Sequence, residues 1–322
     1  MATCQGQMKR GVNIMKKEYI IQIVIGALAL LLVVFMVVKV VNWNKGKDSD
    51  YNPDENNTEF DVEPTDYIQP LSAEQIAGKV DDGVTTFLCI GNSPFADNYS
   101  DNNLAEALGE VYDATVINAG IAGSYITQKN AEVSADYIED GVSLYQMATA
   151  IGSGDFSTVK ATAESMGDEA RAAVSALENT DFTKVDAIFI MYNLEDYADH
   201  RPLGSESVED VTCIYGAVFK AIQAIQEAYP YIKVIMLSQP AGGITIDNFY
   251  VDGDKHDIGC GTLTEYVTFE TQAVASRGAC FVDVYYGAIN IDQRDEYLYD
   301  DYHINDDGAM SIARRVKKLG AY

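Results

Sequence analysis

The sequence predicts an α/β fold, in which helices cover both faces of a five-stranded parallel sheet, preceded by one transmembrane helix. Two observations carry this prediction. Between residues 84 and 320, short apolar runs alternate with longer segments of helical periodicity, which is typical of parallel sheets with helical crossovers. Before this region, residues 19–41 form an apolar run that is long enough to cross a membrane.

The apolar run at 19–41 is interpreted as an uncleaved membrane anchor. Four basic residues precede it, and a basic flank of this kind stays in the cytoplasm. The run is not followed by the small-residue cleavage site of a signal peptide. We therefore expect a single-pass protein of the cell membrane with a cytoplasmic N-terminus at 1–18, an anchor at 19–41, an acidic linker at 42–70 and an extracytoplasmic domain at 71–322.

The charge of the chain also separates these parts. Seven of the 22 Lys and Arg residues but only one of the 49 acidic residues lie up to Lys47, which leaves 15 basic and 48 acidic residues beyond it. A body this acidic repels nucleic acid and anionic lipid, so a nucleic-acid partner is not expected. With 48% hydrophobic residues, the chain has enough apolar material for a large core.

Five short apolar segments are predicted to be the strands of the sheet. They are residues 85–90, 114–119, 186–192, 232–238 and 280–286. Helical periodicity and capping signals predict helices between them. These are residues 102–112, 207–229 with Ser207 as N-cap, 263–278 and 306–320, and the crossover 125–185 is expected to hold two or three more.

Polar residues follow several predicted strands, at the edge where open parallel sheets bind ligands. The first strand runs into Gly91-Asn92-Ser93, and Asp300 lies three residues before His303, just ahead of the last helix. At this spacing a carboxylate can hold the imidazole Nδ1 while Nε2 faces a serine. Ser93, His303 and Asp300 are therefore predicted as nucleophile, general base and orienting acid, although Ser93 alone could equally be a turn residue.

The order of these motifs resembles the SGNH/GDSL hydrolase superfamily over about residues 84–320. Gly91-Asn92-Ser93 is similar to its Gly-Asp-Ser motif, "VINAGIAGS" places Gly123 at its oxyanion glycine, and "DDYH" matches its Asp-x-x-His motif. The resemblance implies a flavodoxin-like three-layer α/β/α fold and serine ester chemistry. It also implies that the backbone N–H groups of Ser93 and Gly123 hold the oxyanion, without a metal or an organic cofactor.

Two positions depart from the pattern of this family. Asn92 replaces the aspartate of the first motif, and Glu195 stands where the third motif has an asparagine that donates to the oxyanion. A carboxylate cannot donate a hydrogen bond unless it is protonated. Asn193 is the alternative donor if the loop turns differently, and the loss of one oxyanion donor costs about 3 kcal/mol of transition-state stabilisation.

The expected function is that of an extracytoplasmic serine esterase, which cleaves short-chain O-acyl esters on a cell-envelope glycan or lipid. Two alternatives remain open. One is an O-acyltransferase that modifies a cell-surface polysaccharide, and the other is an envelope scaffold of the same fold with little or no activity. A disulfide between Cys260 and Cys280 also stays open, because spacing alone cannot establish one.

Overall fold

The computed structural model describes residues 63–96 and 103–322, together with nine scattered positions between 25 and 39, all of them helical. No helix within these described residues is both long enough and apolar enough to cross a membrane. The expected cytoplasmic N-terminus, and most of the expected anchor and linker, lie outside them. The part of the chain from Val62 to Tyr322 forms one compact unit.

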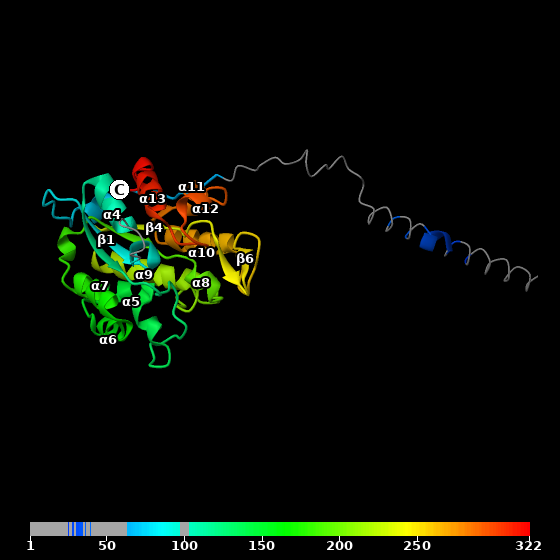
Figure 1. Cartoon of the computed structure of the whole chain (residues 1–322), viewed down its shortest axis with the longest axis horizontal. Helices are drawn as coiled ribbons and strands as arrows, with labels where there is room; N and C mark the ends of the chain where they lie inside the picture. Colours follow the sequence, from blue (N-terminus) through cyan, green and yellow to red (C-terminus); the bar gives the residue numbers. More distant parts are fainter. Residues whose placement is uncertain are drawn as a thin grey trace, which may run out of the picture. The chain divides into compact units, whose positions relative to one another are not determined.

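A five-stranded parallel sheet lies at the centre of this unit, as the sequence predicted (Figure 1). Its strand order is β2-β1-β3-β4-β7, the flavodoxin-like order in which the ligand crevice opens between β1 and β3. Gly91 at the end of β1 is level with Gly120 of β2 and Met191 of β3, so the three strands end together. The strands are β1 Thr86–Gly91, β2 Thr115–Gly120, β3 Ala187–Met191, β4 Lys233–Leu237 and β7 Cys280–Val282.

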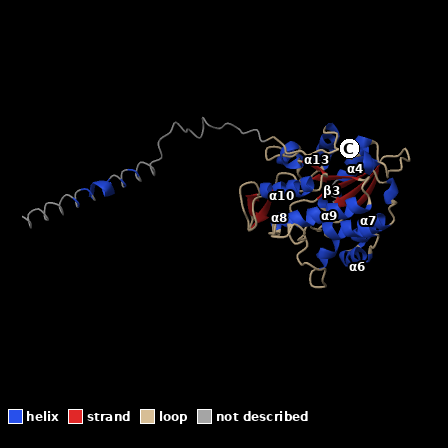
Figure 2. Ribbon diagram, turned by 180° about the vertical axis from the view of Figure 1, so that it is seen from behind, coloured by secondary structure: helices blue, strands red, loops and turns tan. Residues whose placement is uncertain are grey.

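Helices cover both faces of the sheet (Figure 2). Leu88 and Ile90 of β1 point into the apolar core beneath α5, α7 and α9, whereas Phe87 and Cys89 point into the core beneath α4 and α13. Alternate residues of a strand face opposite sides, so β1 must be apolar throughout. The longer helices are α4 Leu104–Tyr112, α5 Leu144–Ser153, α6 Ser157–Met166, α7 Asp168–Glu178, α9 Ile214–Ala228, α10 Leu263–Ser276 and α13 Asp306–Lys318. The shorter ones are α2 Ala73–Ile76, α3 Ser93–Ala96, η1 Ile138–Val142, η2 Phe182–Lys184, α8 Glu195–Ala198, α11 Val284–Gly287 and α12 Arg294–Tyr297.

The helix predicted from Ser207 begins later than expected. α9 starts at Ile214, and a turn precedes it in which Asp210 accepts hydrogen bonds from the backbone and hydroxyl of Thr212 at 3.0 and 2.7 Å. The backbone of Asp210 also lies so close to Gly216 that a Cβ there would be 2.0 Å from the Asp210 carbonyl oxygen. The segment therefore folds back over the first turn of α9 instead of extending it.

The strand predicted at 280–286 is likewise shorter than expected. β7 ends at Val282, and the next residue, Asp283, is the N-cap of α11. Its carboxylate accepts a hydrogen bond from the Tyr286 backbone at 3.0 Å. Side-chain capping of this kind starts a helix, so the apolar residues after Asp283 continue as helix rather than strand.

A hairpin that the sequence did not predict follows β4. Its strands are β5 Gly243–Ile246 and β6 Phe249–Asp252, which pair antiparallel and lie at the rim of the molecule (Figure 1). The two residues of its tip, Asp247 and Asn248, have φ values of 51° and 67°. These residue types tolerate the left-handed conformation that tight hairpin turns need.

The segment ahead of α2 closes the β7 edge of the sheet. Tyr67 and Phe281 exchange backbone hydrogen bonds of 2.9 and 2.8 Å. Arg315 of α13 donates to the Asp66 carboxylate at 2.6 Å, and both side chains are largely buried. An unpaired sheet edge can pair with other chains, and this segment covers part of it.

The cysteines contradict the disulfide that the sequence left open. Cys260 and Cys280 are both free thiols. The Cys280 thiol is buried and donates to the Gln69 carbonyl at 3.3 Å, whereas that of Cys260 donates to the His200 carbonyl at 3.0 Å. Each thiol thus has its own partner in a different part of the fold.

Candidate active site

Ser93 lies at the carboxyl end of β1, as the first residue of α3. The chain turns there at Gly91, where a Cβ would lie 1.8 Å from the Met191 carbonyl oxygen, so only glycine fits. The turn leaves Ser93 only 4% exposed. It also places the Ser93 backbone N–H in the first turn of a helix, where there is no intrahelical acceptor for it.

Asn193 connects two parts of the predicted site. This residue follows β3 and is 4% exposed. Its Nδ2 lies 3.2 Å from Ser93 Oγ and 3.0 Å from the carbonyl oxygen of Tyr302. Because one nitrogen reaches both atoms, they lie within about 6 Å of each other. The structure thus brings the loop that carries His303 beside Ser93.

Asp300 and His303 form a hydrogen-bonded pair, with 2.7 Å between Asp300 Oδ2 and His303 Nδ1. The other oxygen of Asp300 accepts the backbone N–H groups of Tyr302 and His303 at 3.0 and 2.8 Å. Partial burial alone would raise the pKa of Asp300, but these N–H groups and the His303 ring outweigh it, so the pKa lies below its usual value. A charged Asp300 keeps the proton of the neutral imidazole on Nδ1 and leaves Nε2 as an acceptor.

Two tyrosines flank the imidazole of His303. The Tyr299 ring stacks on it at 5.5 Å between centroids and 13° between planes, and the Tyr302 ring lies 4.1 Å away at 33°. Tyr299 and Tyr302 thus restrict how the ring can rotate. The run of tyrosines just before His303 is the sequence signal for these two rings, although it does not tell which of them stacks on the imidazole.

The two departures from the family pattern contact each other. Asn92 is fully buried, and its Nδ2 donates to Glu195 at 2.8 Å and to the Ser124 carbonyl at 3.0 Å. Its Oδ1 accepts the backbone N–H of Asn193 at 2.8 Å. Asn92 therefore joins the ends of β1, β2 and β3. Glu195 accepts from Asn92, and it is Asn193 that presents its amide to Ser93.

Gly123 lies in the turn that follows β2. Its φ is +73°, and no atom would lie within 4 Å of a Cβ there, so the backbone conformation rather than crowding favours glycine. The next residue, Ser124, is the one that accepts from Asn92. The turn is thus attached to the end of β1 through Ser124, and a role of Gly123 at the oxyanion stays a prediction.

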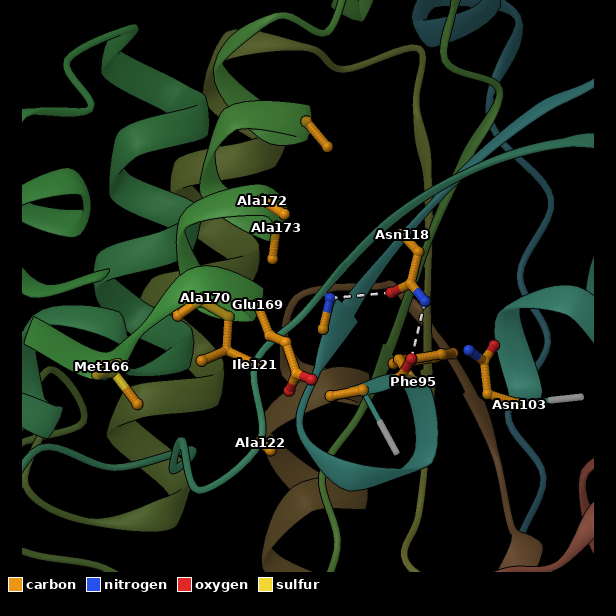
Figure 3. A pocket seen from close by; sticks show the side chains of 13 residues that line it. Phe95, Asn103, Asn118, Ile121, Ala122, Met166, Glu169, Ala170, Ala172 and Ala173 are labelled. Atoms are coloured by element: carbon orange, nitrogen blue, oxygen red, sulfur yellow. Dashed lines mark hydrogen bonds between the residues drawn. The ribbon is translucent and has the colours of Figure 1, made fainter. Parts of the chain in front are cut away.

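A hollow of about 470 Å³ lies on another side of α3, between the end of β2 and α7 (Figure 3). Four alanines of α7 line it, and Glu169 extends from the same helix into it. Asn118 fixes its far wall by donating to the Phe95 carbonyl at 2.7 Å and accepting from the Gly120 backbone at 2.9 Å. Ser93, Asp300 and His303 are not among its lining residues.

The assembled groups are those of acyl-transfer chemistry. A buried hydroxyl lies next to an amide donor, and a carboxylate orients an imidazole on the adjoining loop. Within residues 63–96 and 103–322, no three His, Cys, Asp or Glu side chains gather in a way that could hold a metal ion.

Comparisons with known proteins support the fold. No family model and no curated protein matches the sequence. A solved protein from Lactobacillus plantarum matches with a TM-score of 0.51 and 19% identity, over 73% of this chain and 96% of its own. A second solved structure matches with a TM-score of 0.53 and 19% identity, over 73% and 95%. A possible lipase from Chitinophaga pinensis follows with a TM-score of 0.47 and 15% identity, over 74% and 99%. The first two similarities show that the chain shares its α/β fold with proteins of known structure.

Proposed function

We propose that this chain is a serine esterase of the SGNH/GDSL type, which cleaves O-acyl esters. One observation carries the proposal: the Asn193 amide lies within hydrogen-bond reach of both Ser93 Oγ and the loop that holds His303. This contact supports a site in which Ser93 as nucleophile, Asn193 as oxyanion donor and His303 as base meet at the carboxyl ends of β1 and β3, where this fold binds ligands.

In the first step, Ser93 Oγ attacks the carbonyl carbon of the ester. His303 Nε2 takes the proton of the hydroxyl, and Asp300 stabilises the imidazolium through the 2.7 Å hydrogen bond to Nδ1. The C–O bond to the alcohol then breaks, and His303 returns its proton to the leaving oxygen. Water attacks the acyl-enzyme by the same route, with His303 as base, and releases the acid.

The negative charge of the tetrahedral intermediate needs hydrogen-bond donors close to Ser93. Asn193 Nδ2 is 3.2 Å from Ser93 Oγ, and the Ser93 backbone N–H adds a second donor. Gly123 supplies the third from the turn after β2. In this proposal Asn193 takes the part that the family pattern gives to the position of Glu195.

The chain acts at the outer face of a membrane in this proposal. The apolar run at 19–41, with basic residues before it and an acidic body after it, supports a single-pass anchor with a cytoplasmic N-terminus. The substrate is then a short-chain ester on a cell-envelope glycan or lipid.

Hydrolysis of p-nitrophenyl acetate by the purified full-length chain tests the proposal. Ser93→Ala is expected to lower kcat/KM by at least about 10³-fold, because it removes the nucleophile. Ser157→Ala is the matched control, since Ser157 is exposed on α6. A fluorophosphonate should label the wild type and the control, but not Ser93→Ala.

Two outcomes would contradict the esterase proposal. Hydrolysis that persists in Ser93→Ala would exclude Ser93 as the nucleophile. A folded chain that neither hydrolyses the ester nor takes the label would instead be a scaffold with this fold.

A further inference from the structure

The β5–β6 hairpin has one apolar face that is only partly covered. Ile246 and Phe249 are paired directly across the two strands, next to the tip, and cross-strand partners point to the same side. Ile244 and Val251 form the next pair on that side, because side chains alternate along a strand. Ile244 packs against the core of the domain, whereas Ile246 and Phe249 are 41% and 75% exposed. The face thus runs from the core out to an apolar tip.

The opposite face of the hairpin is bound to the rest of the domain. The Thr245 hydroxyl donates to the carboxylate of Asp301. Arg294 of α12 donates to the Tyr250 hydroxyl and lies 4.6 Å from the centre of the Tyr250 ring. These contacts brace the hairpin, so the exposure of Phe249 is set by the fold and not by a loose loop.

The composition of the tip tells what kind of partner it fits. Phe249 is the most exposed large apolar side chain within residues 63–96 and 103–322. Single exposed apolar residues are common, but here two of them form one patch at the end of a braced hairpin. Residues 243–252 contain Asp247 and Asp252 but no Lys or Arg. The tip therefore suits an apolar partner and does not attract an anionic surface.

The base of the hairpin and the point at which the chain enters the domain are attached to the same short helix. The Thr65 N–H donates to the carboxylate of Asp283 at 2.8 Å, and Asp283 is the N-cap of α11, directly after β7. Tyr285 of α11 donates to Asp254 at 2.9 Å, two residues beyond the end of β6. The entering chain and the hairpin base therefore both lie at the carboxyl edge of the sheet.

The chain that precedes the domain limits how far the hairpin can be from a membrane. Residues 42–62 separate the apolar run at 19–41 from the domain, and 21 residues can span at most about 75 Å. With the anchor proposed at 19–41, the hairpin meets the bilayer at a high effective concentration, so a small apolar contact is enough. The bilayer is also the apolar phase that is always present there, which favours lipid over a separate protein.

We propose that the tip of the β5–β6 hairpin inserts Ile246 and Phe249 into the surface of a bilayer of zwitterionic lipids. The proposal rests on the proposed membrane location of the chain and not on its esterase chemistry. The 48 acidic residues beyond Lys47 disfavour anionic lipid. Because Thr245 of the hairpin binds Asp301, the contact also holds the loop of Asp300 and His303 close to the lipid surface.

Tryptophan fluorescence of the full-length chain in phosphatidylcholine vesicles tests this contact. Trp43 is the only tryptophan of the sequence, so Trp43→Phe gives a background for a single reporter. In this background Phe249→Trp is expected to lose at least half of its emission when the acyl chains of both leaflets carry bromine, a short-range quencher. Val84→Trp is the matched control, because Val84 is 52% exposed but precedes β1, at the opposite edge of the sheet. It should lose less than a tenth.

A second substitution tests whether the apolar pair makes the contact. Ile246→Asp, added to Phe249→Trp, should restore at least half of the lost emission, because it places a charge beside the reporter. Val208→Asp, at an equally exposed position ahead of α9, should restore none. Replacing a third of the phosphatidylcholine by phosphatidylglycerol should weaken the quenching at low salt.

Three outcomes would overturn the hairpin contact while the chain still floats with the vesicles, which leaves the membrane anchor in place. They are equal quenching of Phe249→Trp and Val84→Trp, no quenching of Phe249→Trp, and quenching that Ile246→Asp does not change. A chain that does not float with the vesicles would overturn the anchor and the contact together. Ser93-dependent hydrolysis of p-nitrophenyl acetate is measured separately and is independent of both.

Discussion

Asn92 donates its side-chain amide to the carboxylate of Glu195 at 2.8 Å. These are the two residues at which the chain leaves the family pattern, and each explains the other. An aspartate at position 92 would present a second carboxylate to Glu195 in a fully buried place. Asparagine at 92 makes the contact attractive and still accepts the backbone N–H of Asn193. The departures are a matched pair rather than two separate defects.

The first prediction concerns this pair. Asn92→Asp is expected to lower the free energy of unfolding by about 1–3 kcal/mol, because the donor to Glu195 and to the Ser124 carbonyl is lost. Adding Glu195→Gln should recover part of the loss, since a glutamine can donate to the new carboxylate. Urea unfolding of the wild type, the two single variants and the double variant forms a double-mutant cycle. We expect it to give a coupling free energy of about 0.5–3 kcal/mol between positions 92 and 195. Additive effects would show that the pair is not coupled, and Asn248→Asp in the exposed hairpin tip is the control.

The second prediction tests whether the side chain of Asn193, rather than that of Glu195, donates a hydrogen bond to the oxyanion. Asn193→Ala is expected to lower kcat by about 10²–10³-fold with little change in KM, because its amide is the side-chain donor next to Ser93. Glu195→Ala should cost less than tenfold. Steady-state kinetics with p-nitrophenyl acetate measures both. A larger loss in Glu195→Ala than in Asn193→Ala would refute the assignment.

The third prediction addresses the orienting carboxylate. Asp300→Asn is expected to lower kcat by about 10⁴-fold, because the amide no longer fixes the imidazole with its proton on Nδ1. The depressed pKa of Asp300 means that the carboxylate stays charged above its usual value of 3.8 and loses its charge only below it. Titration of Asp300 should therefore not shape a rate profile measured above pH 5. Asp292→Asn, in an exposed loop, is the control, and an equal loss there would argue against a specific role.

The fourth prediction concerns a buried acid away from Ser93. Glu270 of α10 is 2% exposed, and burial raises its pKa well above the usual 4.5, with further increases from Asp196 and Asp283. With its amide nitrogen turned toward Glu270, Gln239 donates to either carboxylate oxygen at 3.0 Å. The folded state thus holds a proton that the unfolded chain releases above pH 4.5.

The stability that this proton contributes is complete below pH 4.5 and is lost as the pH rises toward the folded pKa. The free energy of unfolding should fall by about 1.4 kcal/mol per pH unit in that window. Glu270→Gln, which carries no titrating group, should show a flatter dependence in urea unfolding between pH 5 and 8. The exposed Glu110→Gln should keep the wild-type slope. An unchanged slope in Glu270→Gln would contradict the prediction.

The five strands of the central sheet could be predicted from the sequence, but the hairpin could not. Each strand of the central sheet is a run of buried apolar residues, such as the fully buried β1. β5 and β6 have four residues each, and most of them are exposed or half-buried. Four residues are the lower limit at which a run or an alternation of apolar residues indicates a strand, so these two segments do not stand out in the sequence.

The three-residue spacing predicted Asp300 and His303, and the end of a predicted strand indicated Ser93. Neither signal could tell which side chain donates a hydrogen bond to the oxyanion. Asn193 and Glu195 are two residues apart in one loop. Which of them approaches Ser93 depends on how that loop turns around the buried Leu194, and this is set by packing against other elements. Asn92 decides the outcome by binding both the Asn193 backbone and the Glu195 carboxylate, across about 100 residues of sequence.

The attachment of residues 66 and 67 to β7 and α13 has a mechanical consequence. Any pulling force that enters through the chain before residue 63 first loads the hydrogen bond from the Thr65 N–H to the Asp283 carboxylate, then the Asp66–Arg315 ion pair and the Tyr67–Phe281 hydrogen bonds. β7 is the edge strand farthest from β2, and β3 and β4 separate it from β1. Tension on the chain before residue 63 would thus disrupt the edge strand β7 before it disturbed the turn that presents Ser93.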